Sequence, residues 1–339
     1  MGNDQQPLVE VKNLKKYFPV SRGFMGRVTG YVKAVDDVNL YVMPGETLGV
    51  VGESGSGKTT MGRCVTKLYE PTGGEVFFHT GERTFSLTKL KGDDLKAFRR
   101  TAQTIFQDPY SSLNPRMNVL QIVGEPVLVN GIAKGRELEE RVTEMIVQVG
   151  LRVEHLRRFP HSFSGGQRQR IGIARALVVN PKLVVADEPV SALDVSIQAQ
   201  ILNLLLDLQS QYQLTYIFIS HAMSVVRYVS NRICVMYGGK MVEVGEKNEL
   251  LAHPKHPYSE VLLGAVPRPS QRRKIRQQAT KGEPPDPANL PSGCVFHPRC
   301  RYAEEVCKVE APALHQMESG SFVSCHLAEK LTLEGIRSG

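Results

Sequence analysis

The sequence contains no apolar stretch that approaches the ~20 residues a membrane-spanning helix needs. Its first residues lack the basic-then-apolar order of a secretory signal. The chain begins Met-Gly, but Gln6 stands where a myristoylation signal has Ser or Thr. There is also no internal repeat. These absences favour a cytosolic protein whose contact with any membrane is made through a partner.

Charge is only moderately biased, with 42 basic against 34 acidic residues and a net charge of +8. That balance permits contact with nucleic acid or anionic lipid without establishing it. The densest basic cluster, Arg272, Arg273, Lys274 and Arg276, lies where seven prolines interrupt residues 267–298. Such a proline content predicts a linker, so a solvated basic stretch is the favoured interpretation.

Residues 52–60 read GESGSGKTT, between an apolar run at 47–51 and a helically spaced stretch that begins at Met61. This strand–loop–helix setting is what the G-x-x-x-x-G-K-[ST] pattern requires. Backbone N–H groups would face the phosphates, Lys58 would reach the β- and γ-phosphates, and the Thr59 hydroxyl would bind Mg²⁺. The sequence therefore predicts a nucleoside-triphosphate site made by Gly52, Ser54, Gly55, Ser56, Gly57, Lys58, Thr59 and Thr60.

A second apolar strand, at 183–186, ends in the two carboxylates Asp187 and Glu188. In a phosphate-loop enzyme the first carboxylate at such a strand end holds Mg²⁺, usually through water. The second is then placed to orient or deprotonate the attacking water. Buried strands often end in an acid, but this pair follows the loop by about 130 residues and has Ser-Ala-Leu-Asp directly after it. The spacing supports a catalytic interpretation.

Short apolar runs alternate with helically spaced stretches, which predicts an α/β fold with a mostly parallel sheet covered on both faces. At 339 residues the chain exceeds the usual size of a single core, so we expect one large domain and an appendage. Helices are expected over 119–149 with interruptions, from 161–167 to about 179, and along a face that includes Ile197 and Leu208. Strands are expected at 8–11, 38–42, 47–51, 75–78, 104–106, 183–186, 216–219, 232–236 and 241–244, with a loop at 21–30.

Taken together, the motifs resemble those of the ATP-binding cassette (ABC) ATPases. The resemblance rests on GESGSGKTT at 52–60, Gln107, FSGGQ at 163–167, VVADE at 184–188, SALD at 191–194 and His221, in matching order and spacing. The S-G-G-Q stretch is the most specific element, although by itself it could be a helix cap. The resemblance implies a RecA-like parallel sheet core, an antiparallel β subdomain and a helical subdomain at about 110–178, all within residues 1–266.

The resemblance also implies two nucleotide sites at the interface of a head-to-tail dimer of cassettes. Each site would pair the Lys58 loop of one subunit with signature residues of the other, namely Ser164, Gly165, Gly166, Gln167 and Asp194. The catalytic set would be Glu188, His221, Gln107 and Lys58, and Mg²⁺ would be held by Thr59, Gln107 and Asp187. A lone Gln or His at a strand end is more often structural, so the assignment of Gln107 and His221 depends on the whole set.

Adenine would stack on an aromatic side chain just after residues 14–16, and the family spacing points to Phe18, with Tyr17 as the second choice. Stacking contributes about 1–3 kcal/mol with little discrimination between bases. A preference for ATP over GTP therefore comes from the resemblance rather than from these two residues.

The six cysteines divide into two groups. Cys64 and Cys234 lie in apolar elements and are expected in the core. Cys294, Cys300, Cys307 and Cys325 cluster after the proline-rich stretch. A cytosolic setting argues against disulfides and suggests a metal site.

The gaps between these four cysteines are five, six and seventeen residues, wider than the pairs typical of structural zinc, and four thiolates also suit an iron–sulfur cluster. CVFHPRC at 294–300 and HPYSEVLLGAVP at 256–267 resemble the C-terminal extension of dipeptide/oligopeptide ABC importers. That branch has members with a 4Fe-4S cluster, so we expect this cluster in residues 267–339, with Zn²⁺ or unliganded cysteines as the alternatives. His297, His315 and His326 are possible substitute ligands.

The leading hypothesis is the ATP-hydrolysing subunit of a solute importer at the cytoplasmic face of the membrane. The resemblance implies two transmembrane permeases, an external solute-binding protein and a second, different cassette subunit. Peptides are the first choice of solute, with oligosaccharides and nickel as alternatives, and residues 110–117 are the expected permease contact.

Two other functions fit the sequence less well. A soluble ABC ATPase acting on nucleic acid or the ribosome would fit the basic charge, but this chain has one cassette, and Gln107 and Ser164 are only 57 positions apart. A degenerate cassette that binds ATP without hydrolysis is disfavoured because Lys58, Asp187, Glu188 and His221 are all present.

Overall fold

An eight-stranded sheet forms the centre of the computed structural model, which describes residues 6–22, 27–81, 83–266 and 285–336. Its strands are β3 (Thr47–Val51), β6 (Ala102–Ile105), β7 (Leu183–Asp187), β8 (Thr215–Ser220), β9 (Arg232–Tyr237), β10 (Lys240–Glu246), β11 (His315–Gln316) and β12 (Phe322–Val323). They lie in the order β11-β12-β10-β9-β3-β8-β7-β6, and the strands from β9 to β6 run parallel. The predicted α/β fold with a mostly parallel sheet is confirmed.

Helices and a second sheet cover the two faces of this central sheet. Successive residues of β7 belong to different hydrophobic clusters. Val184 belongs to the cluster that includes residues of α5 (Gly165–Leu177) and α6 (Val195–Tyr212). Val185 belongs to the one shared with α1 (Lys58–Val65) and the smaller sheet. This period of two is the reason why a fully apolar strand is stable in the middle of the molecule. Because β3, β8 and β7 are parallel, the carboxyl ends of β3 and β7 lie at the same edge of the sheet.

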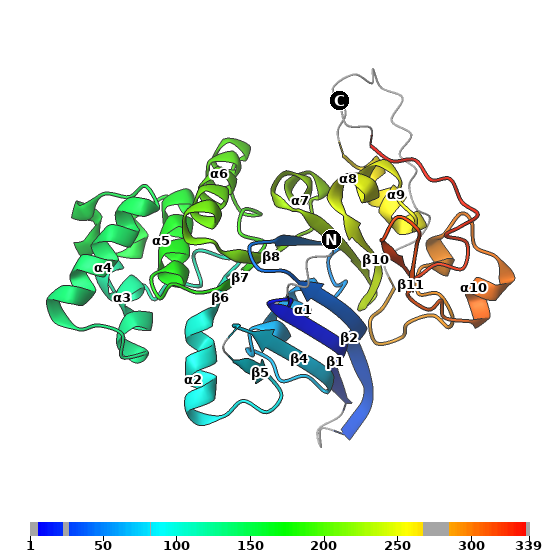
Figure 1. The fold of residues 1–339 in the computed structure, drawn as a ribbon, viewed down its shortest axis with the longest axis horizontal. Helices are drawn as coiled ribbons and strands as arrows, with labels where there is room; N and C mark the ends of the chain where they lie inside the picture. Colours follow the sequence, from blue (N-terminus) through cyan, green and yellow to red (C-terminus); the bar gives the residue numbers. More distant parts are fainter. Residues whose placement is uncertain (1–5, 23–26, 82, 267–284, 337–339) are drawn as a thin grey trace.

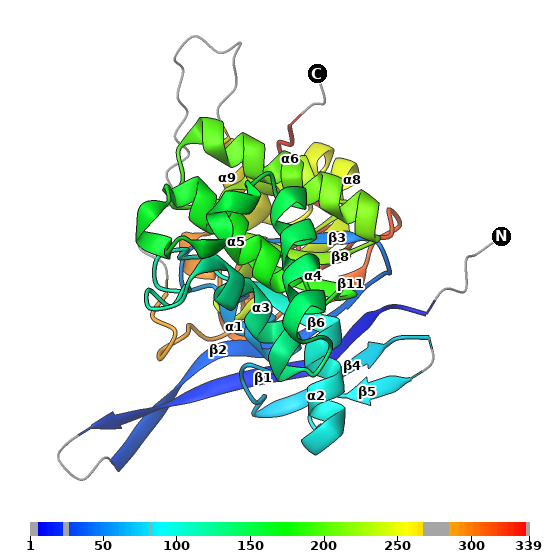
Figure 2. The ribbon, with the colours of Figure 1, turned by 90° about the vertical axis from the view of Figure 1, so that its left-hand side faces the viewer.

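The second sheet is antiparallel and consists of β1 (Val9–Arg22), β2 (Arg27–Val42), β4 (Gly73–His79) and β5 (Thr84–Ser86) in the order β2-β1-β4-β5. Figure 2 shows its β1–β2 pair projecting as a long ribbon. The predicted short strands at 8–11 and 38–42, with a loop at 21–30, were wrong in extent. The ladder continues through Val20 opposite Gly30 to Arg22 opposite Arg27, because pairing satisfies the backbone even where side chains are polar.

A helical lobe lies at the β6 side of the central sheet (Figure 1). It contains α3 (Val119–Val129), α4 (Gly135–Gln148), α5 and the 3₁₀ turns Val153–Arg157 and Pro160–Ser162. The predicted helical stretch at 119–149 is therefore two helices. The first begins with a capping box in which Asn118 and Gln121 exchange hydrogen bonds. Two further helices, α2 (Gly92–Thr101) and α7 (Met223–Val229), lie outside this lobe.

The C-terminal part of the chain joins the central sheet instead of forming a separate body. After α8 (Lys247–Ala252) and α9 (Pro257–Gly264), residues 285–336 contain the 3₁₀ turn His297–Arg299, α10 (Glu305–Val309), β11 and β12. Strand β12 pairs with β10 through Val323 opposite Glu243. Residues 267–284, with most of the expected linker and its basic cluster, lie outside the described residues. None of the helices in the described ranges is long and apolar enough to cross a membrane.

Candidate nucleotide site

The phosphate loop connects β3 to α1, as the sequence predicts. Gly57 has φ +99°, a left-handed conformation that favours glycine. A Cβ atom there would also lie 2.0 Å from the carbonyl oxygen of Ala34 on β2. Only glycine therefore fits at position 57, where the phosphate loop enters α1.

Lys58 is the buried cation of this loop, with 5% of its surface exposed. Its ammonium group donates hydrogen bonds to the carbonyl oxygens of Gly52 at 2.7 Å and Glu53 at 2.8 Å. Burial lowers the pKa of Lys58, while the nearby carboxylates of Glu188, Asp187 and Glu53 act in the opposite direction. The carbonyl groups that hold the ammonium carry no net charge, so its positive charge remains available to attract a phosphate.

Thr59 and Asp187 form the arrangement expected of a magnesium site. The Thr59 hydroxyl donates to Asp187 Oδ1 at 2.7 Å, and Asp187 is 3% exposed at the end of β7. Burial raises the pKa of Asp187. A hydroxyl and a desolvated carboxylate are oxygen donors of the kind that Mg²⁺ prefers, and a bound cation would compensate the buried charge.

Three predicted side chains converge at the next residue. Glu188 Oε2 accepts a hydrogen bond from Gln107 Nε2 at 3.0 Å and lies 3.1 Å from His221 Nδ1. Gln107 follows β6 and His221 follows β8, so neighbouring strand ends bring the two to the carboxylate. A carboxylate held by an amide and an imidazole beside a cation site is suited to orient a water molecule.

The stretch at 164–167 begins α5 with a capping box. Ser164 Oγ accepts from the Gln167 backbone N–H, and Gln167 Oε1 accepts from the Ser164 N–H at 3.0 Å. A Cβ atom on Gly166 would lie 2.6 Å from Ile197 of α6. Across the described ranges, no hydrogen bond or ion pair joins residues 164–167 to the phosphate loop of the same chain. Asp194 is exposed at the start of α6.

The two aromatic candidates for adenine lie on successive positions of β1 and so face opposite sides of the ribbon. The Tyr17 hydroxyl donates to Asp36, and burial, with that hydrogen bond, raises the pKa of Tyr17 to about 12. The Phe18 ring packs edge-on against Tyr69, with 5.7 Å between the two ring centroids. The Lys16 ammonium lies 5.0 Å from the centroid of the Phe18 ring. Both rings are half-buried, so each keeps an accessible surface.

The remaining predicted loop residues make fewer contacts. Ser54 and Gly55 are exposed, and Thr60 is half-buried. Ser56 is buried, and its carbonyl oxygen accepts from the Gly239 N–H at 3.1 Å. These residues lie beside Lys58 and Thr59 in the chain, so the loop is one continuous segment at the sheet edge.

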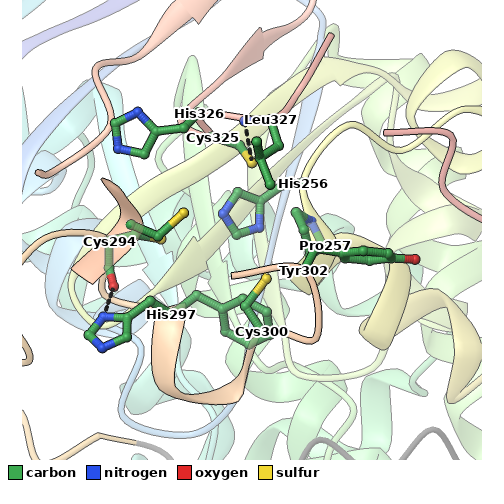
Figure 3. Close-up of a pocket in the computed structure, with 11 residues that line it drawn as sticks. His256, Pro257, Cys294, His297, Cys300, Tyr302, Cys325, His326 and Leu327 are labelled. Carbon is green, nitrogen blue, oxygen red and sulfur yellow. Dashed lines mark hydrogen bonds between the residues drawn. The ribbon is translucent and has the colours of Figure 1, made fainter. Parts of the chain in front are cut away.

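All four tail cysteines line one pocket, together with three histidines (Figure 3). The pocket residues include Cys294, Cys300, Cys307, Cys325, His256, His297 and His326. Burial raises the pKa of Cys300 and Cys325 to about 11. Thiol and imidazole groups are donors for soft metals, but a raised pKa keeps these thiols protonated in the absence of a metal. Within the described ranges, however, no three His, Cys, Asp or Glu side chains are arranged to hold a metal ion.

One set of contacts at the loop was not predicted from the sequence. Arg299, between Cys294 and Cys300, pairs with Glu53 of the phosphate loop, and the Tyr258 hydroxyl accepts the Glu53 backbone N–H at 2.8 Å. These partners are separated by more than 200 positions, and no pattern within either segment indicates that they meet.

Two family models match the sequence. The model described as "ABC transporter" matches residues 35–191, and the model described as "Oligopeptide/dipeptide transporter, C-terminal region" matches residues 242–307.

Similar proteins match over nearly their full lengths. The oligopeptide transport ATP-binding protein AppF of Bacillus subtilis is 49% identical over 96% of this chain and 98% of its own. The dipeptide transport ATP-binding protein DppF of Escherichia coli is 45% identical over 96% of each. Among solved structures, the ATP-binding cassette MJ0796, as a dimer bound to ADP and Pi, has a TM-score of 0.62 and 30% identity over 70% of this chain and 98% of that one.

Proposed function

The chain belongs to the family of ABC transporter ATP-binding proteins, and from that premise we propose that it hydrolyses ATP to power the import of di- or oligopeptides. The observation that carries the proposal is the grouping of Gln107, Glu188 and His221 beside Lys58, Thr59 and Asp187. The peptide substrate is supported by relatives named for oligopeptide and dipeptide transport that match almost the whole chain.

Each residue of the site has a proposed role in hydrolysis. Lys58 and the loop amides bind the phosphates, and Thr59, Asp187 and Gln107 hold Mg²⁺, which would neutralise charge on the transferred phosphoryl group. Glu188 orients and deprotonates the attacking water, and His221 positions the γ-phosphate. Phe18 stacks on adenine, with Tyr17 as the alternative, since its hydroxyl is already engaged by Asp36.

The signature residues 164–167 and Asp194 act on the nucleotide of a facing cassette. Two observations support this proposal: residues 164–167 are not bonded to their own phosphate loop, and Ser164 and Asp194 are exposed. The related cassette MJ0796 is dimeric in a solved structure. A different cassette subunit is the proposed partner. ATP would close the pair, and hydrolysis would reopen it.

The permeases would bind at residues 110–117 on the helical lobe. Tyr110 is 59% exposed there, with the Arg168 guanidinium 4.1 Å from its ring centroid, and Val129 at the end of α3 is 66% exposed. The exposed ring of Tyr110 supports this proposal, because it is accessible to a partner. Through the permeases the protein would lie at the cytoplasmic face of the membrane and work with an external solute-binding protein.

The tail, residues 267–339, is proposed as an extension of the ATPase domain at 1–266 that holds a 4Fe-4S cluster, with Zn²⁺ as the alternative. The support is the gathering of four cysteines at one pocket. Bound metal would cross-link the irregular segments of the tail. A brown anaerobic preparation bleached by dithionite is the expected result, and colourless protein with stoichiometric zinc would overturn the cluster.

Uptake of labelled peptide by cells that lack this subunit tests the transport function. The wild-type chain should restore uptake, and Lys58→Ala should not, because it cannot hold the β- and γ-phosphates. Arg116→Glu, within the proposed permease contact, should abolish uptake while the purified protein still binds ATP. Peptide uptake that never depends on the wild-type chain would refute the peptide substrate.

A further inference from the structure

Glu53 places an acidic side chain inside the loop that is proposed to bind a triphosphate. Its carboxylate is 28% exposed, and its own backbone carbonyl holds Lys58. An unpaired carboxylate at this position would repel a highly charged anion, with little screening in a partly buried site. The loop therefore needs a cation that compensates Glu53 without competing for the phosphates.

Arg299 provides that cation from the opposite end of the chain. Its two terminal nitrogens donate to the two oxygens of Glu53, Nη1 to Oε2 at 2.7 Å and Nη2 to Oε1 at 3.0 Å. The Arg299 side chain is 8% exposed. A two-pronged pair fixes both the charge and the orientation of the carboxylate.

Two tyrosines complete the contact. Arg299 Nη1 also donates to the Tyr237 hydroxyl at 3.2 Å, and the Tyr258 hydroxyl accepts the Glu53 backbone N–H at 2.8 Å. The Tyr237 and Tyr258 rings pack together, with 4.6 Å between centroids. The tail and the start of α9 thus grip one residue of the phosphate loop by its backbone and its side chain.

We propose that Arg299 is a positioning residue for ATP, which neutralises and holds Glu53 so that the phosphate loop accepts the triphosphate. This inference rests on the proposed nucleotide site. Arg299 acts through Glu53 of the loop, so its loss should weaken ATP binding and leave the chemical step largely intact. The nucleotide site near the N-terminus is then incomplete without Arg299 from the C-terminal tail.

Arg301 supplies a matched control. It belongs to the same tail segment and pairs with a buried glutamate, Glu260, at 3.1 Å, but the bonds recorded for it do not involve the phosphate loop. Arg301→Gln removes the same charge from the same region. It should leave the affinity for ATP within about twofold of the wild type.

The experiment measures the dissociation constant for ATP and the kcat and KM of the folded holoprotein in Arg299→Gln, Glu53→Gln, the double variant and Arg301→Gln. Arg299→Gln should raise Kd and KM about five- to thirtyfold and change kcat less than about twofold. Glu53→Gln alone should bind ATP at least as tightly as the wild type. The double variant should recover most of the lost affinity, because no carboxylate is left unpaired.

Recovery in the double variant separates charge compensation from a purely structural tether, which both substitutions would break. Unchanged ATP binding in Arg299→Gln, or a double variant as weak as Arg299→Gln, would overturn the inference. If Arg299→Gln does not fold, ATP binding is measured in the double variant alone. Loss of ATP binding by the double variant would then overturn the inference. A wild-type protein that fails to bind ATP would instead refute the proposed function.

Discussion

At the scale of single residues, Glu188 is held in place by both its backbone and its side chain. Its φ of +45° is a left-handed conformation that residues other than glycine rarely adopt, and its backbone N–H is held by the carbonyl of Ile219 at 3.0 Å. Strain that is held in this way is typical of functional sites. With Gln107 and His221 on the same carboxylate oxygen, Glu188 has little freedom to turn away from a bound water.

Glu188→Gln should slow ATP hydrolysis by roughly 10²–10⁴-fold and leave ATP binding intact, because an amide keeps the shape but cannot accept the proton. Steady-state hydrolysis and equilibrium ATP binding measure the two effects. Glu140→Gln, which changes an exposed glutamate on α4, serves as the control. Near-normal turnover in Glu188→Gln would remove Glu188 from the role of base.

Most residues of the candidate site were proposed from the sequence, but not all of the contacts that they make in the structure. Lys58, Thr59 and Asp187 follow from a loop pattern and a strand end, which are local signals. Gln107 and His221 became candidates only through a family resemblance, because a single polar residue after a strand carries little information. The Arg299–Glu53 pair joins positions 246 residues apart, and only the fold brings them together.

At the scale of elements, buried strands were predicted well and polar ones were not. Strand β3 matches its apolar run at both ends because all five residues are buried. The β1–β2 ribbon is mostly half-exposed, so its length depends on backbone pairing that leaves no hydrophobic pattern. Helix α2 was missed for a related reason, since Phe98 is its one buried residue.

Strand β10 carries an unusual buried acid. Glu243 is fully buried, and it accepts the backbone N–H groups of Lys255 at 2.8 Å and His256 at 3.0 Å. Burial raises the pKa of Glu243 from 4.5 to about 7, while burial lowers the pKa of His256 to about 3. The segment that leads into α9 is therefore anchored to the sheet by a group that folding prefers to keep protonated.

Glu243→Gln should flatten the pH dependence of stability between about pH 4.5 and pH 7. In that window the folded protein retains a proton on Glu243 that the unfolded chain releases, so the wild type loses stability as the pH rises, by up to about 3 kcal/mol. The opposite contribution of His256, lost as the pH falls below 6.5, is common to both proteins. Urea unfolding at several pH values measures the difference, and parallel curves for the two proteins would contradict it.

At the scale of the whole molecule, the phosphate loop and the stretch at 164–167 lie on different parts of the fold. The phosphate loop lies at the carboxyl ends of the central strands, whereas residues 164–167 begin α5 in the helical lobe. The sequence motifs alone could not place these two parts relative to each other. A second cassette facing the first would bring one copy of each to every nucleotide.

Ser164→Arg should abolish ATP hydrolysis in the assembled transporter while the isolated subunit still binds ATP within about twofold of the wild type. An arginine at this cap would crowd the nucleotide of the facing cassette without touching its own loop. Ser210→Arg, an exposed position at the end of α6, is the control. Loss of ATP binding by the isolated Ser164→Arg subunit would show that the serine acts within its own chain.

The pairing of β12 with β10 has a consequence for shortened forms of the protein. A chain that stopped before the tail would leave the main-chain amides and carbonyls on one side of β10 without a partner, ready to recruit strands from other molecules. Proteolytic loss of the last fifty residues, which also removes Arg299, should therefore produce precipitation in addition to weaker binding of ATP. By pairing with β10, the final segment protects the sheet from intermolecular strand addition and aggregation.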